Sequence, residues 1–182
     1  MSIKKEFVLP IIVLSVICLV VSAALAVVNN LTKPVIESKA AERAADARKK
    51  IIPQADNFEL LAIDGLPKRV TEAYRATNDT GFIFMVTVIG YGGEIQLICG
   101  VDPDGKVIMS DVLAHNETQG LGTPIFAQPH AGQYWGRDKN GIESVEAISG
   151  ATITSNAYKN GIRDALLAYE ILTAKNPREA QQ

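Results

Sequence analysis

An uncharged segment of 22 residues, Phe7–Val28, constrains this chain more than any other feature. A helix of that length measures ~33 Å, which matches the ~30 Å hydrocarbon core of a bilayer. Lys4 and Lys5 precede it, and lysines before a first span favour a cytoplasmic N-terminus. The sequence therefore predicts a cytoplasmic N-terminus and one transmembrane helix within residues 1–30, in the inner membrane of the cell, with the main domain outside.

A cleaved signal peptide is the alternative to this anchor. Ala24-Leu25-Ala26 resembles a cleavage site, but the apolar core of a signal peptide is usually only about 7–15 residues long. The length of the segment therefore favours a retained anchor in contact with lipid.

Residues 31–53 predict a helical stalk. Lys33-Pro34 is expected to break or restart the helix, and residues 37–50 consist almost entirely of charged residues and alanine. A helix that is polar all round usually stays in solvent, so a solvated stalk is preferred over a helix that docks a partner. Pro53 is expected to end it.

The remaining chain predicts an α+β domain over residues 54–176, followed by a short tail at 177–182. Apolar runs separated by turn residues predict antiparallel strands joined by short turns, at Phe58–Ile63, Val70–Thr77, Phe82–Ile89, Glu94–Val101 and Lys106–Leu113.

A final amphipathic helix is expected to pack on this sheet. Its apolar positions are Tyr158, Ile162, Ala165, Leu166, Tyr169 and Leu172, at helical spacing. Thr154, Ser155 or Asn156 is expected to cap its N-terminus.

Composition excludes several function classes. With 18 basic and 20 acidic residues the net charge is −2, which gives no electrostatic footprint for nucleic acid. Two cysteines and two histidines exclude a disulfide-stapled scaffold or zinc ribbon and give no metal-ligand spacing. The chain also has no phosphate-binding P-loop motif and no readable pair of nucleophile and base, so no catalytic residue is expected.

Two segments look unlike ordinary packing. Ala114–Pro124 combines polar groups with two glycines, and glycines allow a backbone to approach a ligand closely. Ser149-Gly150-Ala151-Thr152 places small residues before the final helix, where free N–H groups form a natural phosphate site. From the residues alone, a polar surface loop and a tight turn with an N-cap stay open as alternatives.

The two segments in this order resemble the FMN-binding domain found in the G subunit of the Rnf electron-transport complex and in its sister, the C subunit of the Nqr complex. That family carries a His-x-Glu-Thr-x-Gly-Leu-Gly loop, matched here by His115–Gly122, and then a Ser/Thr-Gly-Ala-Thr motif, matched by Ser149–Thr152. The resemblance covers nearly the whole chain, from the N-terminal helix to the second motif. Gln119 stands where the family often has proline.

The resemblance implies one covalently bound FMN per chain. In the family a separate flavin transferase uses FAD as donor, releases AMP and joins the FMN phosphate to the last threonine of the second motif, which is Thr152 here. An unassisted threonine hydroxyl is a weak nucleophile, so outside activation is expected. The signature that the transferase recognises usually has aspartate where this chain has Glu146, one methylene longer.

The resemblance also implies which residues surround the cofactor. They are Glu117, Thr118, Leu121, Gly122 and Thr123 from the loop and Ser149, Gly150, Ala151 and Thr152 from the second motif. His115 is expected to orient the loop. Tyr134 and Trp135 are expected to serve in packing more than in stacking, and Lys159 to be solvated.

By resemblance the chain is an electron-carrying subunit of an ion-translocating ferredoxin:NAD⁺ oxidoreductase, the Rnf complex. Its expected partners are the other membrane and peripheral subunits of the complex, and the chain alone is expected to have no complete activity. The C subunit of Nqr, a stand-alone membrane FMN protein, and a non-redox anchored module that binds a ligand or scaffolds a complex remain the alternatives.

Overall fold

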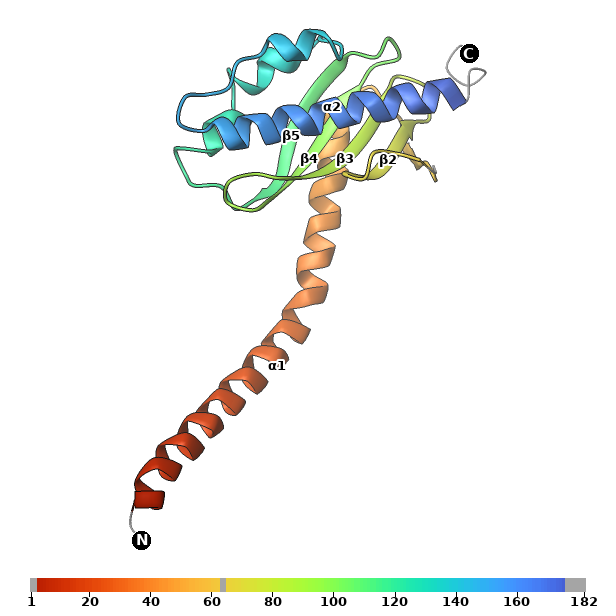
Figure 1. Cartoon of the computed structure of the whole chain (residues 1–182). Helices are drawn as coiled ribbons and strands as arrows, with labels where there is room; N and C mark the ends of the chain where they lie inside the picture. The colour runs from red at the N-terminus through yellow and green to blue at the C-terminus, as the bar shows by residue number, and fades with distance from the viewer. Residues whose placement is uncertain (1–2, 63–64, 176–182) are drawn as a thin grey trace. The chain divides into compact units, whose positions relative to one another are not determined.

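The computed structural model describes residues 3–62 and 65–175 (Figure 1). The chain divides between Arg43 and Ala44 into an N-terminal helical unit and a compact α+β unit. The two ends of the chain, among them the expected tail at 177–182, and Ile63 at the end of the first expected strand lie outside the described residues.

Helix α1 runs without interruption over Ile3–Ile51 and contains Pro10 and Pro34. The predicted break at Lys33-Pro34 is therefore wrong. A proline removes only one helical hydrogen bond, and the residues after Pro34 are rich in alanine, lysine, arginine and glutamate, which favour the helix strongly. The predicted end before Pro53 is confirmed.

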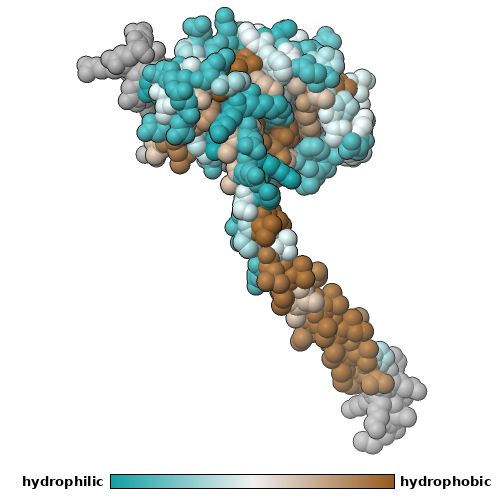
Figure 2. Space-filling view, turned by 180° about the vertical axis from the view of Figure 1, so that it is seen from behind, coloured by the Kyte–Doolittle hydropathy of each residue, from teal (hydrophilic) through white to brown (hydrophobic). Residues whose placement is uncertain are grey.

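Over residues 8–43 the N-terminal unit buries none of its apolar side chains. From Val8 onward the helix contains a stretch long and apolar enough to cross a membrane, and none of that stretch is buried within the structure. Figure 2 shows apolar residues covering this part of α1. Exposed apolar surface of that extent is typical of a segment that meets lipid or another protein.

The compact unit is built on one antiparallel sheet, as predicted. Its strands follow the chain in the order β1-β2-β3-β4-β5, with bounds β1 Phe58–Leu60, β2 Val70–Ala76, β3 Phe82–Ile89, β4 Glu94–Val101 and β5 Val107–His115. Strands β3 and β4 pair in register along their whole length. By contrast, the register between β4 and β5 shifts twice, and such bulges bend a strand at sites that alternation of apolar residues does not reveal.

Helix α2, Thr152–Lys175, lies across one face of this sheet (Figure 1). The apolar positions predicted for it are buried, except that Tyr169 is half-buried. Gly161 brings the helix close to the sheet, because a Cβ there would meet Leu97 Cδ2 at 2.7 Å. Between β5 and α2 the chain forms three short 3₁₀ helices that were not predicted, η1 Thr123–Phe126, η2 Ala131–Tyr134 and η3 Gly141–Ser144.

The start of α2 corrects the predicted cap. The helix begins at Thr152, so Thr154, Ser155 and Asn156 lie inside it. The Thr154 hydroxyl donates to Glu117, and the Ser155 hydroxyl accepts from the backbone N–H of Ile148. Thr154 and Ser155 therefore serve tertiary contacts, and sequence alone could not distinguish these from capping bonds.

The end of α1 covers the other face of the sheet. Ala47, Ile51 and Ile52 are buried against Ile83 and Ile98. A Cβ on Gly100 would meet Ile51 Cγ2 at 2.3 Å, so the bare glycine admits the helix. The compact unit thus includes the chain from Ala44 onward, and one side of the last turns of the expected stalk is buried while Lys49 and Lys50 stay exposed.

Candidate functional site

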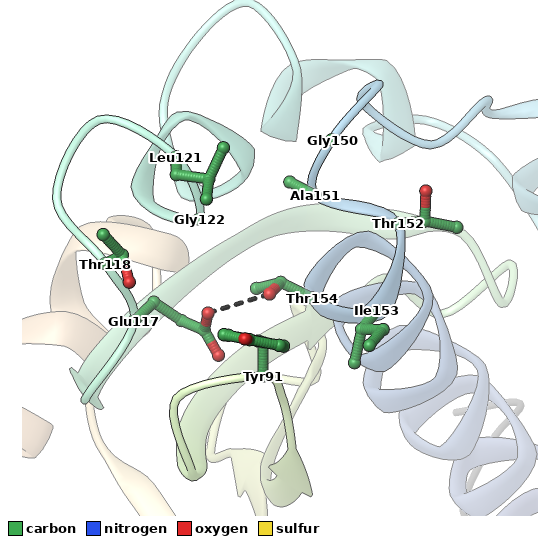
Figure 3. Close-up of a pocket in the computed structure, with 10 residues that line it drawn as sticks. All are labelled: Tyr91, Glu117, Thr118, Leu121, Gly122, Gly150, Ala151, Thr152, Ile153 and Thr154. Atoms are coloured by element: carbon green, nitrogen blue, oxygen red, sulfur yellow. Dashed lines mark hydrogen bonds between the residues drawn. The ribbon is translucent and has the colours of Figure 1, made fainter.

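A cavity of about 400 Å³ opens where the β3–β4 turn, the loop after β5 and the start of α2 meet (Figure 3). That volume lies within the range of small-molecule sites, about 300–1,000 Å³. The cavity is lined by Tyr91, Glu117, Thr118, Leu121, Gly122, Gly150, Ala151, Thr152, Ile153 and Thr154. Both unusual segments of the sequence therefore contribute to one site.

Glu117 joins the three segments that form the cavity. Its side chain is buried, with a relative exposure of 8%. Oε1 accepts a hydrogen bond from the backbone N–H of Gly92 at 3.0 Å, and Oε2 accepts from the Thr154 hydroxyl at 2.8 Å. Hydrogen bonds to a charged acceptor are stronger than neutral ones, so this carboxylate fastens the turn and the helix to the loop.

Glycines make room for that carboxylate. A Cβ on Gly90 would meet Glu117 Oε1 at 2.2 Å, and a Cβ on Gly122 would meet Oε2 at 2.7 Å. A Cβ on Gly92 would meet the carbonyl oxygen of Asn116 at 2.2 Å. These distances are far below van der Waals contact, so a side chain at Gly92 would collide with backbone, and one at Gly90 or Gly122 would displace the Glu117 carboxylate from its present position.

The loop around Leu121 is held by its own backbone. The N–H groups of Leu121 and Gly122 both donate to the carbonyl of Thr118, at 3.2 and 3.0 Å. The N–H of Gly120 donates to Thr123 Oγ1 at 2.9 Å. Leu121 thereby projects from a short, closed turn, and its side chain is 50% exposed.

His115 acts on the loop from the end of β5. Its Nδ1 accepts a hydrogen bond from the backbone N–H of Glu117 at 3.2 Å, and its ring lies 5.0 Å from that of Phe126 between centroids. The residue fixes the direction in which the chain leaves the strand and is not among those that line the cavity.

Thr152 is the first residue of α2, and its side chain is exposed. Thr154 and Ser155, in the same turn of the helix, are 2% and 1% exposed and both are hydrogen-bonded. In Figure 3 the Thr152 hydroxyl points away from Glu117, whereas that of Thr154 points toward it. Thr152 is thus the hydroxyl in this turn that a reagent in solvent can reach.

The residues predicted for the site divide into two groups. Seven line the cavity, namely Glu117, Thr118, Leu121, Gly122, Gly150, Ala151 and Thr152. Three others do not: Thr123 holds Gly120 within the loop, and the exposed Ser149 and Glu146 lie outside the lining.

Sequence reasoning missed three lining residues. Tyr91 appears in the sequence only as part of a glycine turn, Ile153 as an ordinary helical residue and Thr154 as a cap. The signal for Tyr91 was present, since an aromatic residue between glycines is a poor choice for a simple turn. Detecting it required the contact between Gly92 and Glu117, which are 25 residues apart in sequence.

The walls of the cavity suit a planar aromatic group. Tyr91, Leu121 and Ile153 are 71%, 50% and 57% exposed, although large apolar side chains are usually buried. Beside them lie the Thr152 hydroxyl and the first N–H groups of α2, which have no partner within the helix. The site therefore offers apolar contact to a ring system and hydrogen-bond donors to an anion.

Tyr134 and Trp135 pack in the core, as predicted. Tyr134 is fully buried, and its burial, with a smaller contribution from Glu143, raises the pKa of Tyr134 to about 12. Its ring packs edge-on against that of Tyr158 at 5.5 Å. Lys159, which was expected to be solvated, is half-exposed, and its Nζ donates to the carbonyl of Glu143 at 3.3 Å.

In the part of the chain that the structure describes, no group of three or more His, Cys, Asp or Glu side chains is placed to hold a metal ion.

Comparison with known proteins agrees with this geometry. Residues 90–167 match the model of the FMN-binding domain family, a range that starts at the β3–β4 turn and includes every residue that lines the cavity.

Several relatives align over most of their length. The chain is 33% identical to the G subunit of the ion-translocating oxidoreductase complex of Methanosarcina acetivorans, over 91% of this chain and 96% of the relative. It is 30% identical to the G subunit of the proton-translocating ferredoxin:NAD(+) oxidoreductase complex of Clostridium ljungdahlii, over 84% and 86%. The Na(+)-translocating counterpart of Acetobacterium woodii is 28% identical over 89% and 91%.

Proposed function

The chain belongs to the family of G subunits of ion-translocating oxidoreductase complexes, and from that premise we propose that it is a membrane-anchored flavoprotein that relays electrons through one covalently attached FMN. The attachment site is the Thr152 hydroxyl, joined to the FMN phosphate. The observation that carries this proposal is the exposure of Thr152 at the first residue of α2, on the wall of a cavity that both motifs line.

The residues present fit FMN. The exposed apolar side chains of Tyr91, Leu121 and Ile153 suit the flavin ring, and the backbone N–H groups at the start of α2 suit a phosphodiester, which keeps a negative charge. When bound, FMN supplies one- and two-electron chemistry, and the protein positions it and adjusts its potential. The wall is completed by Thr118, Gly122, Gly150 and Ala151, and Thr123 supports it through its bond to Gly120; the exposed Ser149 precedes them in the second motif.

Attachment requires an accessible nucleophile and an external donor. A flavin transferase uses FAD: the Thr152 oxygen forms a bond to the phosphorus of the FMN half, the pyrophosphate bond breaks, AMP leaves and the hydroxyl proton is released. Gly150, which adopts a left-handed φ of +82°, and Ala151 leave the approach to Thr152 open. The exposed Glu146 serves recognition by the transferase, as the aspartate does in the family.

The anchor is the apolar part of α1. Its exposed apolar surface matches lipid, and the two N-terminal lysines favour a cytoplasmic N-terminus, which puts the FMN domain on the outer side of the inner membrane. The relatives are named as subunits of complexes that translocate ions. We therefore propose that the partners are the other subunits of such a complex, and that electrons pass between them through this domain.

Flavin on a denaturing gel tests the attachment. The full chain is co-expressed with a flavin transferase, and the gel is imaged for flavin fluorescence before staining, with intact mass measured on the same sample. The wild type and Thr152→Ser, which keeps a hydroxyl, are expected to gain the mass of one FMN less one water. Thr152→Val, which keeps the shape but has no hydroxyl, is expected to gain nothing.

The opposite results would overturn the attachment. A flavin adduct on Thr152→Val would put it on another residue, and an unmodified wild type beside a labelled known substrate of the same transferase would remove covalent attachment altogether. A C-terminal fusion to alkaline phosphatase tests the orientation separately, since that enzyme is active only outside the cytoplasm.

A further inference from the structure

We propose that Tyr91 is the aromatic partner of the flavin ring, held against it by the Glu117 hydrogen bond to the β3–β4 turn. This inference rests on the proposed function and extends it to a residue that neither sequence motif contains. Three properties of Tyr91 support it: the exposure of its ring, the rigidity of its turn and the side chains beside it.

The exposure of Tyr91 is anomalous for its setting. The side chain is 71% exposed although it lines the cavity. Aromatic rings contribute most to stability or binding when they are buried. A solvent-exposed tyrosine that lines a cavity therefore indicates a surface that a ligand covers.

The turn that carries Tyr91 is fixed on both sides of that residue. The N–H of Gly90 donates to the carbonyl of Gly93 at 2.8 Å, which closes the turn. The N–H of Gly92 donates to Glu117 Oε1 at 3.0 Å. This carboxylate is itself buried, and it accepts a hydrogen bond from the Thr154 hydroxyl in the first turn of α2. The backbone of Tyr91 is therefore tied to the loop after β5 and to the start of α2, and little backbone entropy is lost when a ligand binds against its ring.

Two other exposed apolar side chains line the same cavity as Tyr91. In the view of Figure 3, Tyr91 and Leu121 lie on opposite sides of the Glu117–Thr154 hydrogen bond, and Ile153 projects from the start of α2. Leu121 and Ile153 are 50% and 57% exposed. Three such side chains around one cavity form a slot for a flat ring, in which tyrosine supplies the aromatic face.

Flavin fluorescence distinguishes this role from a structural one. A phenol in contact with a flavin ring quenches the flavin fluorescence by donating an electron, whereas a phenyl ring does not. The full chain with covalent FMN, purified in detergent, is compared with Tyr91→Phe and Tyr91→Ala. Tyr74→Phe is the matched control, because Tyr74 packs in the cluster on the other face of the sheet.

The expected result is a several-fold longer fluorescence lifetime in Tyr91→Phe and Tyr91→Ala, with Tyr74→Phe equal to the wild type. Unfolding in urea should brighten the wild type strongly and Tyr91→Phe only slightly. Tyr91→Ala should also raise the midpoint potential, since an electron-rich ring stabilises the oxidised, electron-poor flavin.

An unchanged lifetime in Tyr91→Phe would overturn the proposal, as would an equal change in Tyr74→Phe. Intact mass separates this failure from that of the attachment. If the mass shows no adduct, the same lifetimes are measured on the chain saturated with free FMN, and chains that do not bind FMN at all would overturn both proposals.

Discussion

Two turns of the same sheet contain glycine and connect neighbouring strands, yet they are held in different ways. The β4–β5 turn satisfies itself: Asp102 Oδ1 accepts from the N–H groups of Asp104 and Lys106, at 3.0 and 2.8 Å, and the Asp102 carbonyl accepts from Gly105 at 3.0 Å. The β3–β4 turn instead donates its Gly92 N–H to a carboxylate 25 residues away, on the loop after β5.

The difference separates a turn that only connects strands from one that builds a site. The first is closed by hydrogen bonds within residues 102–106, a common turn pattern, and the Tyr169 hydroxyl on α2 adds one bond to the Pro103 carbonyl. The second is closed by the bond from Gly90 to Gly93 and is in addition tied to the loop after β5 and to the start of α2, because Glu117 bridges these segments. Substitutions in the β3–β4 turn should therefore change the surroundings of bound FMN, and substitutions in the β4–β5 turn should not.

The largest effect is expected from Glu117→Ala. The change leaves the Gly92 N–H and the Thr154 hydroxyl without their acceptor in a buried place, at a cost of about 1–3 kcal/mol for each such group. We expect the free energy of unfolding to fall by about 3 kcal/mol on that basis, measured by urea unfolding of the full chain in detergent with Trp135 fluorescence. The lifetime of bound FMN should lengthen, because Tyr91 is released.

Glu117→Gln is the matched control for that change. Its amide oxygen can accept from Gly92 and its amide nitrogen can donate to Thr154, so most of the stability should return. Equal losses in the two variants would show that the charge of Glu117 matters and not its bridging bonds. No loss in either would remove Glu117 from the framework of the site.

A second contrast comes from the glycines of the two turns. Gly92→Ala brings a Cβ to within 2.2 Å of the Asn116 carbonyl oxygen, and such overpacking costs about 1–3 kcal/mol. Gly105→Ala is strained by its left-handed φ of +79°, at about 1–2 kcal/mol, and its Cβ would lie 3.0 Å from Tyr169 Cε1, a side-chain atom rather than backbone. Asparagine tolerates that φ, so Gly105→Asn should be milder than Gly105→Ala.

At Gly92, asparagine should be no better than alanine, because the obstacle there is space. Unfolding midpoints of the four variants measure the contrast, with FMN lifetimes expected to change only for the Gly92 pair. A rescue by Gly92→Asn would contradict the close-approach explanation.

The locally determined elements of the fold were predictable from the sequence. The bounds of β3 and β4 match the predicted strands, since alternation and local turns decide them. The uninterrupted α1, the burial of Ile51 and Ile52 and the start of α2 at Thr152 were not foreseen. The burial at the end of α1 depends on a partner far away in sequence, since Gly100 makes the room for Ile51.

The same distinction applies to the site. The resemblance to a family pointed to the loop at 117–122 and to Thr152, and the structure brings these together around one cavity. Tyr91 and Thr154 were missed because their roles arise from the Glu117 bridge, which no local pattern encodes. The sequence also could not show which threonine is exposed. Only the fold shows that the Thr152 side chain is exposed and that of Thr154 is buried.

A smaller effect is expected from Asp102→Ala in the β4–β5 turn. The change removes the acceptor for two N–H groups that water can reach, so we expect a loss of about 1 kcal/mol in the free energy of unfolding. Asp102→Asn, which keeps an acceptor oxygen, should recover most of it. Neither variant should alter the fluorescence lifetime or the amount of bound FMN, and a change in either quantity would show that this turn is coupled to the site.

The smallest effect concerns Tyr169, whose hydroxyl donates to the Pro103 carbonyl in the same turn. Burial, and after it the charges of Asp102 and Asp104, raise the pKa of Tyr169 above its ordinary value. The unfolded chain therefore loses this proton near pH 10 while the folded chain keeps it, so the free energy of unfolding falls as the pH rises through about 10. Tyr169→Phe should make that fall shallower, measured as the urea midpoint against pH.

The lost hydrogen bond to Pro103 lowers the free energy of unfolding equally at every pH below that range, so only the slope against pH reports the titration of Tyr169. An unchanged slope would mean that the other tyrosines account for the alkaline loss of stability.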